Sequence, residues 1–320
     1  MTNPKAIRDD ILVVALGGNA LVRSPNHASI RDQAETVRSL APALVDLALG
    51  VDSIVVTHGN GPQVGYILRR SELALGEVAP VPIDYAVGDT QGAIGHMFLL
   101  AVRSELAARR VDRPVVALTT QVLVDADDPA FATPNKPVGA IHDEATARRN
   151  AERFGWTIAE DSGHGWRRTV PSPEPIRILE LPVIRSLLAA KTIVVACGGG
   201  GIPVVDDGRG RLAGVEAVVD KDRTSALLAD ALDARTLLIS TNVPAIALDY
   251  RGPSERWVSS LTVSEVDELL ASGAFVGGMA PKIAAISQFV RRGESRRGIV
   301  TSIDLMVEAV AGRAGTTVGA

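Results

Sequence analysis

The chain has 320 residues, 46% of them hydrophobic and 22% charged, a composition typical of a globular protein large enough for two lobes around one sheet. A net charge of −4 and an aromatic content of 3% argue against a nucleic-acid binder, which needs a basic surface and rings on which bases stack. A single cysteine excludes an intrachain disulfide. We expect a cytoplasmic protein that contacts no membrane, because the sequence has neither a secretion-type apolar region nor an apolar stretch of the roughly 18 residues that span a bilayer.

Apolar, β-branched runs alternate with helix-like patterns along most of the chain. We expect strands near residues 11–16, 52–57, 114–118, 177–181, 192–197, 235–240 and 297–301. We expect helices near residues 29–49, 62–75, 84–110, 182–190, 222–233, 262–271, 280–292 and 302–312. This order predicts an α/β protein with an open, mainly parallel, doubly wound sheet and helices on both of its faces.

The alternation breaks between about residues 120 and 175, where prolines, glycines and aspartates crowd together. We interpret this stretch as an inserted, protruding subdomain that resembles a lid. Its tryptophans, Trp156 and Trp166, favour a small packed unit over a disordered one. Further along, residues 206–210 have the composition of a surface hairpin turn.

Three of the apolar runs end abruptly in small residues. The runs are followed by Gly17-Gly18-Asn19, by His58-Gly59-Asn60-Gly61 and by Cys197-Gly198-Gly199-Gly200-Gly201. Each predicts a buried parallel strand whose carboxyl end opens into a glycine turn, where backbone N–H groups can approach an oxyanion. Any α/β fold needs tight turns, but ligands of open sheets bind at this edge, so three such turns favour a phosphate site.

Two common nucleotide-binding motifs are disfavoured. The P-loop requires Gly-Lys followed by Ser or Thr, and the dipeptide Gly-Lys does not occur in the chain. The stretch from Gly59 to Gly65 differs from the dinucleotide fingerprint because three residues precede its last glycine. The interpretation that remains is an enzyme that transfers a phosphoryl group with the help of backbone amides, lysines and a carboxylate.

Lysine is rare in this chain, with five lysines against 28 arginines, so each lysine is a candidate for a specific role. A lysine is a compact charge on a flexible stem and can follow a phosphoryl group during its transfer. Lys5 and Lys191 are expected to be solvated surface cations. Lys136 lies in the inserted segment, Lys221 opens a predicted helix, and Lys282 follows a glycine turn at the start of another helix.

Three further candidates each have a structural alternative. Asp222 is placed to hold two lysines and Mg²⁺-linked waters in line for phosphoryl transfer, and it could equally cap a helix. His58 could contact a substrate or complete a turn. Cys197 is expected to be a small buried side chain, since nothing beside it in the sequence would lower the pKa of its thiol.

Seven motifs follow one another in a specific order and spacing. They are Ala15 to Leu21, Thr57 to Gly65, Lys136 to Gly139, Gly165 to Arg168 with Val170 to Pro173, Ala196 to Val204, Asp220 to Asp222, and Gly278 to Lys282. Each is modest alone, but together they resemble the carbamate kinases, within the amino acid kinase superfamily. The resemblance extends from about residue 11 to about residue 310.

The resemblance implies an αβα sandwich, a homodimer, and reversible phosphoryl transfer between ATP and carbamate, often run toward ATP in arginine breakdown. Residues 1–185 would form the acceptor lobe and residues 186–320 the nucleotide lobe. Carbamate or carbamoyl phosphate would be bound by Gly17, Gly18, Asn19, His58, Gly59, Asn60 and Gly61. The catalytic residues would be Lys136, Lys221, Asp222 and Lys282. ATP or ADP would be seated by Gly198, Gly199, Gly200, Gly277, Gly278 and Met279, with Mg²⁺ held by the nucleotide phosphates and water and not by a protein metal site.

The chain departs from the family pattern at a few positions. Gly278, Ala280 and Asn242 stand where Ser, Gly and Asp are usual, which affects nucleotide contacts alone. Related kinases carry a lysine where this chain has Ala15, so we expect Lys136 to supply that charge when the inserted segment closes. Two alternatives stay open: a related kinase of another carboxylate, and a catalytically silent nucleotide sensor on the same fold.

Overall fold

The computed structural model describes residues 10–17, 21–22, 28–161, 163–275 and 277–319. Its largest component is an eight-stranded sheet with the strand order β15-β17-β16-β12-β1-β2-β9-β3. Neighbouring strands run parallel except β16 and β17. The strands are β1 (Ile11–Leu16), β2 (Ser53–His58), β3 (Val115–Ala117), β9 (Ile193–Val195), β12 (Thr236–Thr241), β15 (Ser260–Thr262), β16 (Arg297–Ser302) and β17 (Thr316–Gly319). The predicted α/β sheet is confirmed.

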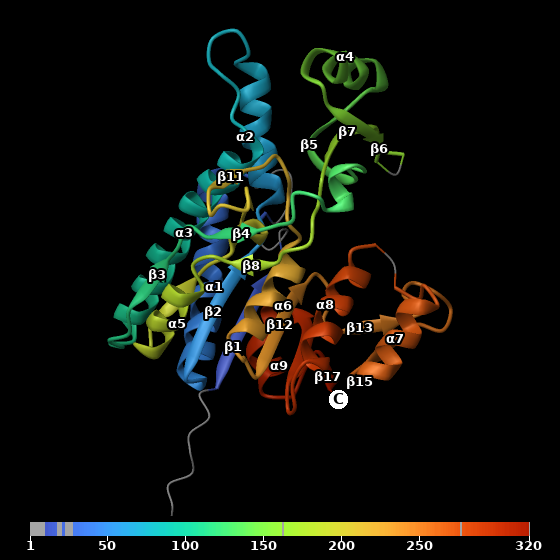
Figure 1. Cartoon of the computed structure of the whole chain (residues 1–320). Helices are drawn as coiled ribbons and strands as arrows, with labels where there is room; N and C mark the ends of the chain where they lie inside the picture. The colour runs from blue at the N-terminus through green and yellow to red at the C-terminus, as the bar shows by residue number, and fades with distance from the viewer. Residues whose placement is uncertain (1–9, 18–20, 23–27, 162, 276, 320) are drawn as a thin grey trace, which may run out of the picture.

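Helices cover both faces of this sheet (Figure 1). One face packs against α1 (Ile30–Gly50), α3 (Ile83–Ala108) and α9 (Met306–Val310). The other packs against α5 (Leu181–Ala189), α6 (Lys221–Ala231), α7 (Val263–Ala271) and α8 (Met279–Arg291). Strand β1 shows why its sequence is apolar throughout: Leu12 and Val14 join the first core, whereas Val13 and Ala15 join the second.

Local signals fix where several helices begin. Ser29 accepts the backbone N–H of Asp32, and the Asp32 carboxylate accepts the backbone N–H of Ser29, which is a capping box at the start of α1. Thr262 and Glu265 form the same arrangement at the start of α7. Asp220 caps α6.

A second, four-stranded sheet has the order β11-β10-β4-β8. Its strands are β4 (Gln121–Leu123), β8 (Arg177–Ile178), β10 (Ile202–Asp206) and β11 (Leu212–Gly214). The antiparallel pairing of β10 with β11 confirms the predicted hairpin turn. The strand expected over 177–181 begins at the predicted residue but is too long, since β8 spans only two residues and α5 begins at Leu181. It pairs with β4 and so belongs to the second sheet and not to the main one. A further hairpin joins β13 (Ile246–Leu248) to β14 (Arg256–Val258).

A small subdomain stands out above the main sheet (Figure 1). It contains β5 (Lys136–His142), α4 (Glu144–Phe154), β6 (Thr157–Glu160) and β7 (Trp166–Val170), and its sheet has the order β5-β7-β6. The strands β4 and β8, which flank it, belong to the second sheet. Strand β5 contacts α2 (Gly61–Leu73), which rises beside the subdomain. Trp156 packs on Phe154 with ring centroids 5.2 Å apart, as expected of a packed unit.

The remaining elements are short turns of 3-10 helix. They are η2 (Pro129–Phe131), η3 (Gly198–Gly200) and η4 (Ile303–Leu305). The helix expected over 302–312 is therefore shorter than predicted: η4 comes first, and α9 covers only Met306–Val310. No helix within the described residues has the length and apolar character needed to traverse a bilayer.

Candidate active site

The three glycine turns lie at the carboxyl ends of three neighbouring strands, β1, β2 and β9. The Gly17 N–H donates to Ser240 Oγ at 3.1 Å, and the Gly59 N–H donates to the Leu16 carbonyl oxygen at 3.1 Å. The first two turns are thus joined to each other and to β12. Gly18 and Asn19, also expected to bind the acceptor, lie outside the described residues.

His58 ends β2 with its ring fully buried. Its Nδ1 donates to the Gly59 carbonyl oxygen at 3.0 Å, and its ring stacks on Phe98 with centroids 5.9 Å apart. Burial, helped by the charge of Lys221 and opposed by the hydrogen bond to Gly59, lowers the pKa of His58 to about 4. The imidazole is therefore neutral at pH 7 and packs behind the turn. This geometry favours the structural alternative, and a contact with substrate stays a prediction.

Asn60 and Gly61 form the start of α2. The Asn60 Nδ2 donates to Thr90 Oγ1 at 2.8 Å, which fixes a buried amide between α2 and α3. Gly61 is the first helical residue and Pro62 lies in the first turn, where its missing N–H removes no helix hydrogen bond. The first N–H groups of α2 therefore belong to the second glycine turn.

The third turn, η3, is buried between β2 and α6. A Cβ at Gly199 would lie 2.1 Å from Asn60 Nδ2, and one at Gly200 would lie 2.3 Å from the Val219 carbonyl oxygen. Since both φ angles are also positive, at 67° and 92°, only glycine fits here. Gly198, Gly199 and Gly200 were predicted to seat the nucleotide, and the structure places them directly against the predicted acceptor turn.

The carboxylate of Asp222 joins two of the predicted catalytic lysines. Asp222 lies in the first turn of α6 and is 3% exposed. Its Oδ1 contacts the ammonium of Lys221, and its Oδ2 lies 2.8 Å from Nζ of Lys282, which reaches across from α8. A hydrogen bond of 2.7 Å between Thr57 Oγ1 and Ser225 Oγ holds α6 against β2. These contacts place two cations at the carboxyl edge of the sheet.

The charges in this triad are not balanced. Burial lowers the pKa of Lys221, the carboxylate of Asp222 opposes that shift, and the charge of Lys282 adds to it. Two ammonium groups around one carboxylate leave one unit of positive charge at a place shielded from water. A multiply charged phosphoryl group is the ligand that such a triad stabilises best.

Lys136 reaches the same helix start from the protruding subdomain. As the first residue of β5, it places Nζ 3.0 Å from Oδ2 of Asp220. Asp220 Oδ1 accepts the backbone N–H groups of Asp222 at 2.9 Å and Arg223 at 3.4 Å. Burial raises the pKa of Asp220, but the charge of Lys136 and these hydrogen bonds outweigh it, so the pKa is lowered. All three candidate lysines thus meet at the first turn of α6.

The predicted nucleotide loop lies at the start of α8. Gly277 has a φ of 62°, Gly278 is the N-cap, and Met279 is the first helical residue, one turn before Lys282. Among the described residues, no atom lies within 4 Å of a Cβ placed at Gly277 or Gly278, so the loop has open space beside it.

Several polar residues at the site were missed by the sequence interpretation. Gln91 Nε2 donates to the Gly198 carbonyl oxygen at 2.9 Å, and Gln91 Oε1 accepts the Thr120 N–H at 2.8 Å. Thr224 Oγ1 donates to the Gly200 carbonyl oxygen at 2.8 Å. These buried side chains hold the third turn in shape. The only available signal was a polar residue within an apolar helix pattern, which is too common to single out.

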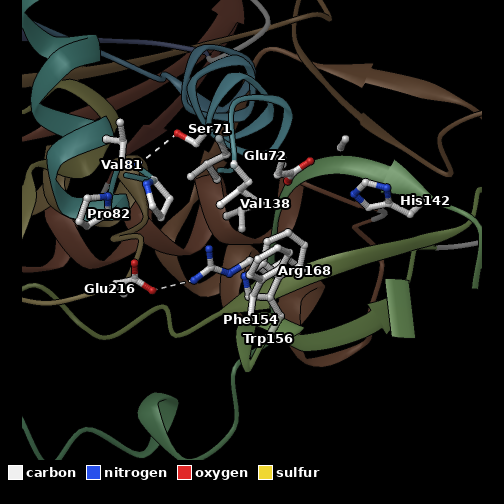
Figure 2. A pocket seen from close by; sticks show the side chains of 15 residues that line it. Ser71, Glu72, Val81, Pro82, Val138, His142, Phe154, Trp156, Arg168 and Glu216 are labelled. Atoms are coloured by element: carbon white, nitrogen blue, oxygen red, sulfur yellow. Dashed lines mark hydrogen bonds and ion pairs between the residues drawn. The ribbon is translucent and has the colours of Figure 1, made fainter. Parts of the chain in front are cut away.

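Two cavities flank these residues. One of about 500 Å³ opens at the carboxyl ends of β1, β12 and β16, and Gly17, Ser240 and Asn242 are among its lining residues. The other, of about 240 Å³, lies at the base of the subdomain (Figure 2). Figure 2 shows Arg168 reaching Glu216, 2.7 Å away, beside the rings of Phe154 and Trp156. None of the four candidate catalytic residues lines either cavity.

Comparison with known proteins identifies the class. The amino acid kinase family model matches residues 10–302, which is most of the chain. The chain therefore belongs to the amino acid kinase family. Structures with weaker similarity, such as a UMP kinase from Bacillus anthracis at 13% identity and a TM-score of 0.52, share the fold alone.

Within that family the chain belongs to the carbamate kinases. It is 43% identical over 311 residues to the carbamate kinase of Thermococcus kodakarensis, covering 96% of this chain and 98% of the relative. A structure of the carbamate kinase from Giardia lamblia bound to AMP-PNP has 34% identity and a TM-score of 0.90, with 97% of this chain and 98% of that one covered. A carbamate kinase-like protein from Escherichia coli is 39% identical over 311 residues.

Proposed function

We propose that this protein transfers a phosphoryl group reversibly between ATP and carbamate, and that it acts in the cytoplasm, where ATP is available. The observation that carries the proposal is the triad of Lys221, Asp222 and Lys282 beside the glycine turns. Similarity over nearly the full length to carbamate kinases supports the choice of acceptor.

The reaction requires little covalent chemistry from the protein. In the forward direction a carbamate oxygen forms a bond to the γ-phosphorus, the bond from that phosphorus to the β,γ-bridging oxygen breaks, and ADP leaves. Gly17 and Gly59 bring backbone close to the acceptor. Lys221 and Lys282 neutralise charge on the phosphoryl oxygens, and Asp222 keeps the two ammonium groups at the fixed separation that this requires.

In this scheme Mg²⁺ would bind together with the nucleotide, as its complex. Both oxygens of Asp222 are already occupied by lysines, and within the described ranges no three metal-ligating side chains gather in a cluster. The cation would therefore be held by nucleotide phosphates and water, where it neutralises phosphate charge. The open loop of Gly277 to Met279 would seat the nucleotide, which makes residues 186–320 the nucleotide lobe and residues 1–185 the acceptor lobe.

One coupled assay tests the proposal. With Mg²⁺, ADP and carbamoyl phosphate the protein should form ATP. With ATP as the donor, acetylglutamate, aspartate and UMP should not be phosphorylated, because the close backbone at Gly17 and Gly59 leaves little room and neither turn holds an arginine to bind a second carboxylate. Turnover of one of these larger acceptors without turnover of carbamoyl phosphate would show that the related-kinase alternative is right. Absence of any turnover would favour the silent sensor.

We also propose a homodimer that forms through α3. Tyr85 and Leu100 on this helix are 68% and 56% exposed. Two glycines of α3 face the interior of the chain and not a partner, because Gly88 packs against Ile202 and Gly95 against Ala117. Light scattering at micromolar concentration should give twice the chain mass, and Leu100→Glu should shift the population toward monomer. A monomer mass for the unaltered chain would exclude the dimer.

A further inference from the structure

Asp220 has two functions in the structure, one for each carboxylate oxygen. Oδ1 caps α6 by accepting the N–H groups of Asp222 and Arg223. Oδ2 binds the ammonium of Lys136 at 3.0 Å. The first contact fixes the helix turn that carries Lys221 and Asp222, and the second holds the candidate lysine of the subdomain beside that turn.

The segment before α6, residues 215–220, receives several contacts from the subdomain and its exit. In the described part of the chain two ion pairs cross to it, from Lys136 to Asp220 and from Arg168 to Glu216. In addition, the Val218 N–H donates to the Pro171 carbonyl oxygen at 3.0 Å. The end of this segment also touches the third glycine turn. These contacts connect the subdomain to the first turn of α6 and to the third glycine turn through one segment.

We infer that Asp220 is a positioning residue, which holds Lys136 beside the site and transfers it to the phosphoryl group when substrate binds. The inference rests on the proposed function. Lys136 has 38% of its side chain exposed, whereas Asp220 is 16% exposed and held by its capping bonds. Lys136 then exchanges one anionic partner for another, while the Asp220 carboxylate keeps the hydrogen bonds from the N–H groups of Asp222 and Arg223. Asp220 continues to cap α6 during this exchange, so Lys221 and Lys282 stay in place.

Asparagine separates the two functions of Asp220. It is as good an N-cap as aspartate, because its side-chain oxygen accepts the same backbone N–H groups, but it carries no charge for Lys136. Asp220→Ala removes both functions. The matched control is Asp143→Asn, because Asp143 caps α4 in the subdomain through the Thr146 N–H at 2.8 Å and pairs with no lysine of the described chain.

The test measures kcat, the KM for ADP and thermal stability during ATP formation from carbamoyl phosphate. Lys136→Ala should lower kcat strongly and leave the KM for ADP nearly unchanged. Asp220→Asn should lower kcat by about fivefold, as expected for one partly buried ion pair, with the KM for ADP and the unfolding midpoint near those of the unaltered protein. Asp143→Asn should change none of these.

A double mutant provides the decisive readout. Combined with Lys136→Ala, Asp220→Asn should have no further effect, because its partner is already gone. An equal loss of kcat with and without Lys136 would mean that Asp220 acts only as a cap and would overturn the inference, as would an Asp220→Asn variant with unaltered kcat. If the unaltered protein makes no ATP from carbamoyl phosphate, the proposed function itself fails. The two failures are therefore distinguishable.

Discussion

Asp222 holds one lysine on each of its carboxylate oxygens, so removal of either Lys282 or the carboxylate charge should disrupt both cations. We expect Lys282→Met or Asp222→Asn to lower kcat by on the order of 10²-fold, a few kcal/mol of lost transition-state stabilisation, while the protein stays folded. Steady-state kinetics and circular dichroism check this. Lys191→Met is the matched control, because Lys191 pairs with Asp52 just before β9, at the opposite edge of the sheet from the triad. A kcat near that of the unaltered protein would leave the altered residue with a structural role only.

His58 predicts a specific acid sensitivity at the residue scale. Its pKa is about 4 in the folded protein and 6.5 when unfolded, so between these pH values the unfolded state binds the extra proton. The stability contributed by neutral His58 is complete above pH 6.5 and is lost as the pH falls toward 4. The free energy of unfolding should fall by about 1.4 kcal/mol per pH unit from this residue alone.

The measurement compares denaturant unfolding of the unaltered chain with that of His58→Gln across this pH range. The variant should lack that component of the slope, whereas His164→Gln, at an exposed position of the subdomain, should retain it. Parallel curves for the unaltered chain and His58→Gln would contradict the buried neutral imidazole.

At the scale of elements, two glycines on α3 should respond to alanine in opposite directions. A Cβ at Gly95 would lie 2.8 Å from the Cβ of Ala117 on β3, so Gly95→Ala should destabilise the fold by roughly 1–3 kcal/mol. A Cβ at Gly92 would meet no atom of the described residues within 4 Å, so in the Leu100→Glu background, which disfavours the proposed dimer, Gly92→Ala should stabilise the helix by about 0.5–1 kcal/mol. Thermal unfolding measures both, and Ala117→Gly should rescue Gly95→Ala. If Ala117→Gly does not rescue Gly95→Ala, the contact between these two Cβ atoms is not the cause of the destabilisation.

The sequence alone was sufficient to predict the helices and strands that have strong local signals. Strands buried on both faces, such as β1, are continuous apolar runs, and α1 begins at a capping box. Three-residue strands such as β13 and β15 are too short to show a period, and their pairing depends on distant partners. The triad was foreseeable from the rarity of lysine. The contact between Lys136 and Asp220 was not, because 84 positions separate them and only the folded subdomain brings them together.

At the scale of the whole molecule, the protruding subdomain should be separable from the body. Its first and last strands are neighbours, with Lys136 paired to Val170, and neither of the two large cores contains a described residue between them. Replacing residues 137–169 by a short Gly-Ser turn should leave the unfolding midpoint close to that of the intact chain. Calorimetry should still detect ADP binding, whereas turnover of carbamoyl phosphate should be lost. Loss of folding would show that the body depends on the third, smaller core, which contains Val138 and Val170.

The gathering of three of the five lysines at one helix start has a consequence for chemical ageing. Carbamoyl phosphate decays in water to cyanate, which adds to neutral amines to give a carbamyl-lysine, whereas the 28 guanidinium groups stay protonated and do not react. Burial lowers the pKa of Lys221, which raises the neutral fraction of this amine. The decay product of the enzyme's substrate should therefore inactivate it by modifying Lys221, and nucleotide bound against the triad should slow that loss.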